Sequence, residues 1–322
     1  MANFELAVCA DLQVWDRFVE SSPQGSAFSS SRFLAALDAR CEFLTVIENG
    51  VPVLAVPVLL DNDTPHLLPY PYVQYAGPMF SLSVEQQPSH RRIPLKLGIV
   101  EFLLEKMAAR WPRISFVLHP GFDDLRAIQW FNYHAPEKGQ FAVQLAYTGR
   151  ISLAADAAET DFLERVRTVR RQEFRKAESL GFRFEECRNV DELDRLHELT
   201  FSRQGLTRAE EEVRHLRSIS QAALEHQFGD CFVARAATGE AASAILFLYD
   251  RDNAYYLFGA NDPEFRKTGA GSWLMLKAID HARRAGRKAV DFVGINSPNR
   301  GDFKTSFGAQ PVPYFVTTWQ RP

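Results

Sequence analysis

The sequence predicts an α/β (α+β mixed-sheet) protein with two domains, in which helices flank central mixed sheets. The chain has 322 residues, and domains of about 150 residues are common, so we expect two of them. The second half shows two helices, three consecutive strands, and then alternating helices and strands. The first half repeats this order loosely. We therefore place one domain at residues 1–155 and the other at residues 156–322, with a last strand that could pack on the first domain.

The composition is that of a globular protein, with 46% hydrophobic and 24% charged residues. The formal net charge of -3 gives no bulk attraction to DNA. No apolar run is long enough to span a membrane. The four cysteines are scattered and form no C-x-x-C pair, so neither a metal site nor a redox motif is expected. We expect a cytoplasmic protein that binds no metal.

In the first half, Asn49-Gly50 separates two apolar runs and is a strong β-hairpin signal, with strands over 42–48 and 51–60. The segment 67–80 is rich in aromatic residues and prolines, and we expect it to be irregular. The remaining elements follow from hydrophobic periodicity and capping residues: helices over 11–21, 29–39, 94–110 and 122–132, and strands over 114–119 and 141–147.

The second half begins with a long predicted helix over 159–180, which Gly181 ends. Short polar turns separate the three strands that come later and predict an antiparallel meander. The remaining elements again follow from periodicity: helices over 190–204, 209–227, 270–285 and 303–307, and strands over 231–237, 241–250, 253–260, 288–294 and 312–319.

The sharpest local motif lies between the third meander strand and the helix that follows it. Its residues are Arg266, Lys267, Thr268, Gly269, Ala270, Gly271 and Ser272. The glycines allow a tight turn with accessible N–H groups, and the start of the helix adds its positive end, so the motif could hold a diphosphate. The alternative is that the glycines only form a loop.

The spacing Arg266-x-x-Gly269-x-Gly271 resembles the R/Q-x-x-G-x-G/A loop of the Gcn5-related acetyltransferase (GNAT) superfamily, and the resemblance covers about residues 182–322. It implies acyl-CoA as co-substrate, with the loop amides on its diphosphate. It also implies that the strand carrying Phe258 and Gly259 binds the pantetheine arm.

The segments R-T-V-R-R-Q-E-F-R-K-A-E-S-L-G-F, D-F-V-G and F-K-T-S-F-G together resemble the Fem-type peptidyltransferase and FemAB-like acyltransferase group. This resemblance implies two tandem GNAT-like domains, the first of them degenerate and on the acceptor side. The chain lacks a long charged heptad insertion and keeps the intact loop, which favours acyl-CoA over aminoacyl-tRNA as the donor.

A related subgroup acts on nucleotide-linked amino sugars, so the resemblance favours a small acceptor amine of this kind, as used for cell-envelope polysaccharides. Transfer from aminoacyl-tRNA to a cell-wall precursor, and a binding module without catalysis, remain as alternatives. The acceptor amine would attack the thioester directly, since no serine or cysteine has the setting of a nucleophile.

Three residues are candidates for catalysis. Lys304 lies between two phenylalanines and could neutralise a phosphate or the developing oxyanion, or could reach solvent with its charged end. Asp291 ends a buried strand and is either a structural carboxylate or the general base. Tyr256 and a bridging water are the other candidates for the base.

The remaining candidates concern the acceptor. Arg167, Arg171 and Arg175 share one helix face, and Arg170 or Arg171 could hold a nucleotide phosphate, although a solvated ion-paired face is equally consistent. Tyr70, Tyr72 and Tyr75 could stack on a base or sugar, or serve in packing. Asn296 is a further candidate for substrate binding.

Overall fold

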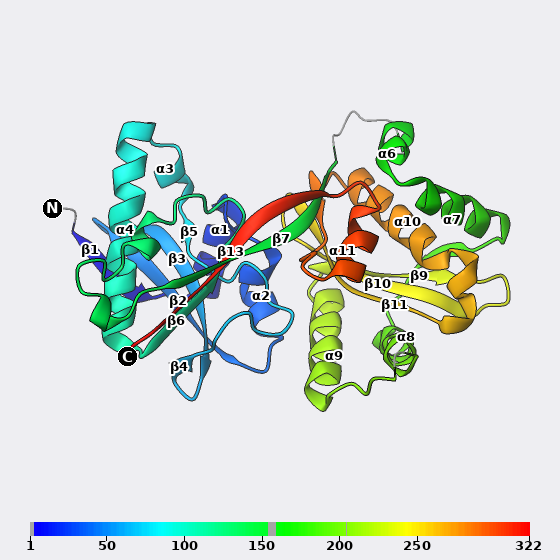
Figure 1. Cartoon of the computed structure of the whole chain (residues 1–322), viewed down its shortest axis with the longest axis horizontal. Helices are drawn as coiled ribbons and strands as arrows, with labels where there is room; N and C mark the ends of the chain where they lie inside the picture. Colours follow the sequence, from blue (N-terminus) through cyan, green and yellow to red (C-terminus); the bar gives the residue numbers. More distant parts are fainter. Residues whose placement is uncertain (1–2, 154–158, 204) are drawn as a thin grey trace. The chain divides into compact units, whose positions relative to one another are not determined.

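The computed structural model describes residues 3–153, 159–203 and 205–322, and the chain divides into two units (Figure 1). Unit 1 comprises Met1–Ala146 and Pro313–Pro322, and unit 2 comprises Tyr147–Val312. The chain passes from unit 1 to unit 2 within β7 (Ala142–Ser152) and returns within β13 (Gln310–Gln320). The residues of β13 from Pro313 onward therefore belong to the first unit.

Unit 1 is built around an antiparallel sheet in the order β1-β2-β3-β4, with β5 also paired to β3. A second antiparallel pair joins β6 to β13. The elements are β1 (Phe4–Val8), α1 (Leu12–Ser21), α2 (Ser31–Leu34), β2 (Arg40–Glu48), β3 (Val51–Asp61), β4 (Thr64–Pro65), β5 (Met79–Phe80), α3 (Leu82–Glu85), α4 (Ser89–Arg110), β6 (Arg113–Val117) and α5 (Arg126–Gln129).

The predicted hairpin is confirmed, because β2 and β3 pair from Glu48↔Val51 around a two-residue turn. Asn49 and Gly50 have φ angles of 49° and 80°, as a type I′ turn requires. The predicted helix over 29–39 is wrong. The structure has a 3₁₀ turn over Ala27–Ser29 followed by the one-turn helix α2. Ser30 caps α2, and the apolar residues of α2 are buried without a longer helix.

Two further expectations for this unit need correction. The helix predicted over 122–132 is only α5, a single turn. Helix α4 starts at Ser89, five residues before the predicted start, and continues through Pro94, which cannot donate a helical bond to the carbonyl of His90. The strand β1 at the start of the chain was not predicted.

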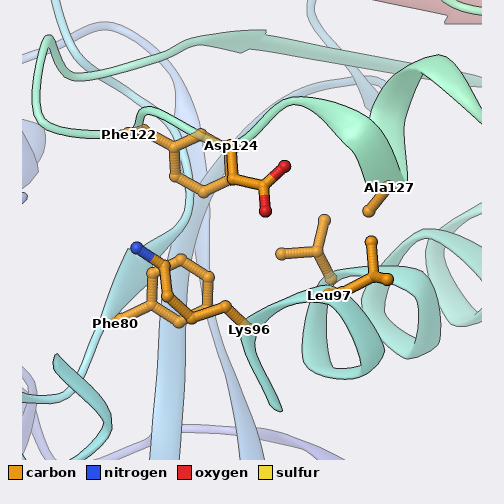
Figure 2. Close-up of a pocket in the computed structure, with 7 residues that line it drawn as sticks. Phe80, Lys96, Leu97, Phe122, Asp124 and Ala127 are labelled. Atoms are coloured by element: carbon orange, nitrogen blue, oxygen red, sulfur yellow. The ribbon is translucent and has the colours of Figure 1, made fainter. Parts of the chain in front are cut away.

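A small cavity in unit 1 lies between α4 and the segment before α5 (Figure 2). Its volume of about 10 Å³ is only enough for a single water. Lys96 faces this cavity, but its Nζ pairs with Glu85 Oε1 at 2.9 Å and lies 4.6 Å from the centre of the Phe80 ring. Residues of the same unit thus satisfy the buried lysine, and the cavity is too small for a substrate.

Unit 2 contains a sheet in the order β7-β12-β11-β10-β9-β8, in which only β11 and β12 run parallel. Its elements are α6 (Glu159–Arg165), α7 (Thr168–Ser179), β8 (Arg183–Glu186), α8 (Val190–Ser202), α9 (Glu210–Glu225), β9 (Gly229–Arg235), β10 (Ala241–Tyr249), β11 (Asn253–Asn261), the 3₁₀ helix η3 (Pro263–Thr268), α10 (Ala270–Arg284), β12 (Ala289–Asp291) and α11 (Pro298–Thr305).

Helices cover both faces of this sheet. Helices α10 and α7 lie on one face, and α8 and α9 lie on the other (Figure 1). The buried face of α10 carries Trp273, Leu274 and Ile279 against the sheet. This apolar contact fixes where the helix begins, as its sequence pattern predicts.

The single helix predicted over 159–180 is wrong, because the chain leaves the helical conformation at Arg167 and forms two helices, α6 and α7. The N–H of Arg167 bonds to the carbonyl of Ser306, and the β-branched residues Val166, Thr168 and Val169 around it are weaker helix formers. The strand β8 was also missed. None of the helices in the described ranges is long and apolar enough to cross a membrane.

Candidate active site

Strand β11 is paired with β12 only along its first part. Strand β12 pairs only with Asn253–Tyr255 and ends at Asp291, so in the described part of the chain no strand follows β11 on that side. On its other side, the register with β10 shifts at Leu246/Phe247, and Leu257 is the extra residue of a β-bulge. An open strand edge beside a bulge can bind an extended ligand through backbone groups.

The glycine motif lies close to the end of this strand. Gly269 has a φ of 85° and caps α10 from the left-handed region, which favours glycine. Arg266 and Lys267 form the exposed end of η3. The N–H of Ala270 bonds to Thr268 Oγ1, whereas helix geometry leaves the next amides, of Gly271 and Ser272, without an acceptor inside the helix.

A cleft of about 460 Å³ opens at this turn, and we call it the α10 cleft. Its walls come from α7, η3, the first turn of α10, the ends of β10 and β11, and α11. Three arginines and one glutamate line it, a net charge of +2: Arg170, Arg203, Arg266 and Glu173. The motif is therefore next to an open, positively charged space and is not plugged by its own side chains.

Helix α7 closes the opposite side of the turn. A Cβ atom on Gly269 would lie 2.5 Å from the carbonyl oxygen of Glu173, so only glycine allows this approach. Lys176 Nζ donates to the carbonyl of Lys267 at 2.7 Å. Ser272 Oγ donates to Glu173 Oε2 at 2.5 Å. A carboxylate of the protein itself thus lies at the first turn of α10, which the sequence did not reveal.

Arg170 connects α7 to both neighbouring helices. Its Nε donates to Ser306 Oγ at 2.9 Å, and its Nη1 donates to Ser272 Oγ at 3.0 Å and to Glu173. Its guanidinium carbon lies 4.9 Å from the centre of the Phe303 ring. These contacts hold the arginine in the wall of the α10 cleft, where it shapes the site with part of its charge already paired.

The other arginines of this helix are less engaged with the cleft. Arg171 donates from Nη2 to Thr168 Oγ1 at 3.1 Å. Arg167 pairs with Asp302 at 2.7 Å. Arg175 is exposed. Arg167 thus forms an ion pair on the helix surface, which was the alternative to a phosphate contact. A phosphate contact by Arg171 stays a prediction.

Lys304 lies at the end of α11, in apolar surroundings. Its Nζ donates to the carbonyls of Phe292 and Gly294 at 2.7 and 2.8 Å and lies 5.7 Å from the centre of the Tyr256 ring. Burial, with a smaller effect of Arg300, lowers the pKa of Lys304 to about 8. The ammonium has a third proton, which these two bonds do not use.

Tyr256 points from β11 into the same region. Its ring packs against Phe247 and Phe292, and its hydroxyl passes so close to Gly259 that a Cβ there would lie 1.8 Å from the oxygen. Burial raises the pKa of Tyr256 to about 12, so the phenol is protonated at neutral pH. Tyr256 is therefore unfavourable as a base, and its protonated hydroxyl can donate a hydrogen bond.

Asp291 supports the loop that holds Lys304. Its Oδ1 accepts from Thr148 Oγ1 at 2.5 Å and from the N–H of Val293 at 2.7 Å. Val293 and Gly294 have φ angles of 52° and 91°, and the carbonyl of Gly294 is a partner of the lysine. These bonds fit the structural alternative for Asp291 and leave less capacity for a role as base.

Asn296 belongs to the same supporting loop. Its Oδ1 accepts from the N–H of Tyr147 at 2.7 Å. The residue is exposed. Its place in substrate binding stays a prediction.

The three candidate tyrosines lie in unit 1. Tyr70 is buried, with its hydroxyl donating to the carbonyl of Asp38. Tyr75 is also buried and packs edge-on against Phe28 and Tyr314. The packing alternative describes both residues. Tyr72 is half-buried with a φ of 64°, and its place in substrate binding stays a prediction.

His197 was not singled out from the sequence. It lies on the buried face of α8, and its ring contacts those of Phe201 and Phe258. Burial and the neighbouring Arg208 guanidinium lower the pKa of His197 to about 4, so the ring is neutral at physiological pH. Its position among the apolar residues of an amphipathic helix was the signal available in the sequence.

Comparison with known proteins identifies the domain. Residues 164–305 match the family model described as Acetyltransferase (GNAT) domain. No curated protein matches the sequence. In the described ranges, no group of three or more His, Cys, Asp or Glu side chains could hold a metal ion.

Solved structures resemble the whole chain. FemX is 15% identical, with a TM-score of 0.71 over 97% of this chain and 96% of its own. A tandem GNAT protein from the clavulanic acid biosynthesis pathway is 13% identical, with a TM-score of 0.53 over 99% and 98%. L-PGS from Bacillus licheniformis is 12% identical, with a TM-score of 0.56 over 97% and 92%. The second unit is therefore an acetyltransferase domain of the GNAT superfamily, in a chain that has the fold of FemX and of tandem GNAT proteins.

Proposed function

We propose that the protein is an N-acyltransferase that uses acyl-CoA as its donor and transfers the acyl group to a primary amine. The observation that carries this proposal is the α10 cleft. There the first turn of α10, the basic end of η3 and the open end of β11 line one positively charged space. A diphosphate fits the free amides of a helix start, and an extended arm fits an unpaired strand edge.

The reaction requires an oxyanion to be stabilised when the amine attacks the thioester carbonyl. Lys304 offers its remaining proton, and the Tyr256 hydroxyl, which has no partner in the described residues, offers another. Donors that are already fixed in an apolar site stabilise a developing charge more effectively than water does. The tetrahedral intermediate then collapses with release of the CoA thiolate, and the amine loses its proton to a base or a bridging water.

We propose a nucleotide-linked amino sugar as the acceptor, with the reaction in the cytoplasm. The support for this acceptor is the resemblance to the FemAB-like group, together with exposed basic and polar residues near the cleft, such as Arg203 and Asn299. Arg171 and Asn296 would bind polar parts of the acceptor.

Aminoacyl-tRNA is the second candidate donor, and one observation favours it. The carboxylate of Glu173 lies at the first turn of α10 and accepts from Ser272. Its negative charge offsets part of the positive potential that the helix start would offer to a diphosphate. The fold shared with FemX and L-PGS fits either donor. Under this alternative, tRNA would be the partner and a cell-wall precursor the acceptor.

Isothermal titration with acetyl-CoA, free CoA and aminoacyl-tRNA separates these possibilities. The proposal predicts binding of CoA that Arg266→Ala weakens, and release of free thiol when UDP-linked amino sugars are added. Arg284 is exposed at the far end of α10, so Arg284→Ala supplies a matched control. Binding of aminoacyl-tRNA without any binding of CoA would overturn the proposal in favour of the alternative. CoA binding without turnover on any amine would indicate a binding module.

A further inference from the structure

Two of the four cysteines face each other at the end of the sheet opposite to the α10 cleft. Strand β8 pairs with β9 in a register that brings Glu186 opposite Phe232, so Cys187 lies opposite Cys231. The N–H of Cys187 bonds to the carbonyl of Cys231 at 2.8 Å. Opposite residues of such a pair have Cα atoms about 5.5 Å apart, within the range of about 4.4–6.8 Å that a disulfide spans.

Small reagents can reach this pair. Both cysteines are buried within the fold, but both line a cleft of about 520 Å³ whose other walls include Asp230, Tyr249 and His281. The thiols are free. The pair thus combines proximity with an entry route, whereas in the described residues Cys9 and Cys41 lie in unit 1 without such a partner.

The two thiols differ in their surroundings. Cys187 Sγ lies 3.3 Å from both Glu192 Oε2 and the carbonyl of Asn189. The hydrogen bond from the Cys231 thiol lowers the pKa of Cys187, while the same contact, with burial, raises the pKa of Cys231. Cys187 is therefore the better nucleophile toward an oxidant, and Cys231 resolves the product when its thiol gives up its proton during the attack.

We propose that Cys187 and Cys231 form a redox-sensitive pair that hydroperoxides convert into a disulfide between β8 and β9. The Cys187 thiolate attacks the peroxide oxygen and breaks the O–O bond, giving a sulfenic acid and releasing hydroxide. The sulfur of Cys231 then attacks the sulfur of the sulfenic acid, and its proton leaves with the hydroxyl as water. In sum, two thiols and one hydrogen peroxide give one disulfide and two waters.

The disulfide would secure an edge strand. Strand β8 is the last strand in the sheet order of the described residues, next to β9. It directly follows α7, which supplies Arg170 and Glu173 to the α10 cleft. A cross-link that closes a long loop restricts the unfolded chain and stabilises the folded one. This inference does not depend on the proposed acyl transfer.

The test treats the full-length protein with hydrogen peroxide, alkylates the remaining thiols under denaturing conditions, and maps the peptides by mass spectrometry. We expect two of the four thiols to be lost, with one disulfide-linked peptide pair that contains Cys187 and Cys231. We also expect a thermal midpoint higher by several degrees, reversed by dithiothreitol. Cys187→Ser and Cys231→Ser should each abolish the linked peptide, whereas the matched control Cys41→Ser should retain it.

Three results would overturn the proposal. These are four intact thiols after treatment, a disulfide that involves Cys9 or Cys41, and oxidation of Cys187 to a sulfinic acid with Cys231 still free. The peptide mapping is done on the unmodified sequence, so the outcome stands even if a serine variant folds poorly.

Discussion

Removing the negative charge of Glu173 should strengthen the binding of CoA. Its Oε2 accepts from Ser272 Oγ and Arg170 Nη1, both at 2.5 Å, so the carboxylate lies at the helix turn where we place the diphosphate. Glu173→Gln keeps the shape of the side chain and one acceptor oxygen. The main change is therefore one unit of charge, which raises the net charge of the residues lining the α10 cleft from +2 to +3.

The size of the effect follows from Coulomb's law. Two unit charges about 8 Å apart, at an effective dielectric constant of about 40, repel by about 1 kcal/mol. For a diphosphate with about two charges, Glu173→Gln should make the binding free energy of CoA more favourable by about 1–2 kcal/mol. This change lowers Kd by about 5- to 30-fold. The variant loses an ion pair whose side chains are 18% and 33% exposed, so its stability should fall by less than about 1 kcal/mol.

Isothermal titration of CoA at low and high salt measures this effect. The gain should shrink as salt increases, because the cleft is open to solvent. Glu164→Gln makes the same charge change at an exposed position of α6 and should leave Kd unchanged. If Glu173→Gln folds normally and binds CoA no more tightly than the wild type, the diphosphate does not bind at the first turn of α10.

Three further changes test the surrounding residues. Lys304→Met should lower kcat by about 100-fold or more with little change in the Kd of CoA. Because the pKa of Lys304 is about 8, the wild-type rate should fall as pH rises through this value; a rate that continues to rise above pH 8 contradicts a role for the ammonium. Gly259→Ala must displace the Tyr256 hydroxyl, and urea denaturation should show a loss of about 1–3 kcal/mol; unchanged stability would mean that the ring moves freely. The pKa of His197 is about 4 in the folded protein and about 6.5 in the unfolded chain. Protonation of this residue therefore lowers the free energy of unfolding as pH falls from about 6.5 to about 4. Between pH 7 and 5, the free energy of unfolding of the wild type should therefore fall by about 1–2 kcal/mol more than that of His197→Phe. Parallel pH profiles of the two proteins would disprove this.

Local signals in the sequence were sufficient for several elements. Asn49 and Gly50 both favour the positive φ angles that a type I′ turn needs, so the hairpin was predictable. The glycine motif at 266–272 and the apolar face of α10 are equally local, and both lie where the pattern indicates. The helix break at Arg167 was not predicted. The β-branched residues Val166, Thr168 and Val169 were a weak local signal for it, and the bond from Arg167 to Ser306 depends on a distant part of the chain.

The composition of the candidate site depended on contacts between distant parts of the chain. Glu173 meets Ser272 across 99 positions, and Asp291 meets Thr148 across 143. Cys187 and Cys231 become neighbours through the register of an edge strand that the sequence did not indicate.

The sequence by itself determined the class of fold, the glycine turn and its helix, because these follow from backbone preferences and hydrophobic periodicity within short segments. Only the tertiary structure decided that a carboxylate lies at that turn and that Lys304 shares its surroundings with Tyr256. It also decided that Tyr70 and Tyr75 belong to a core. Such pairings are set by strand register and helix packing over the whole domain, and no local pattern encodes them.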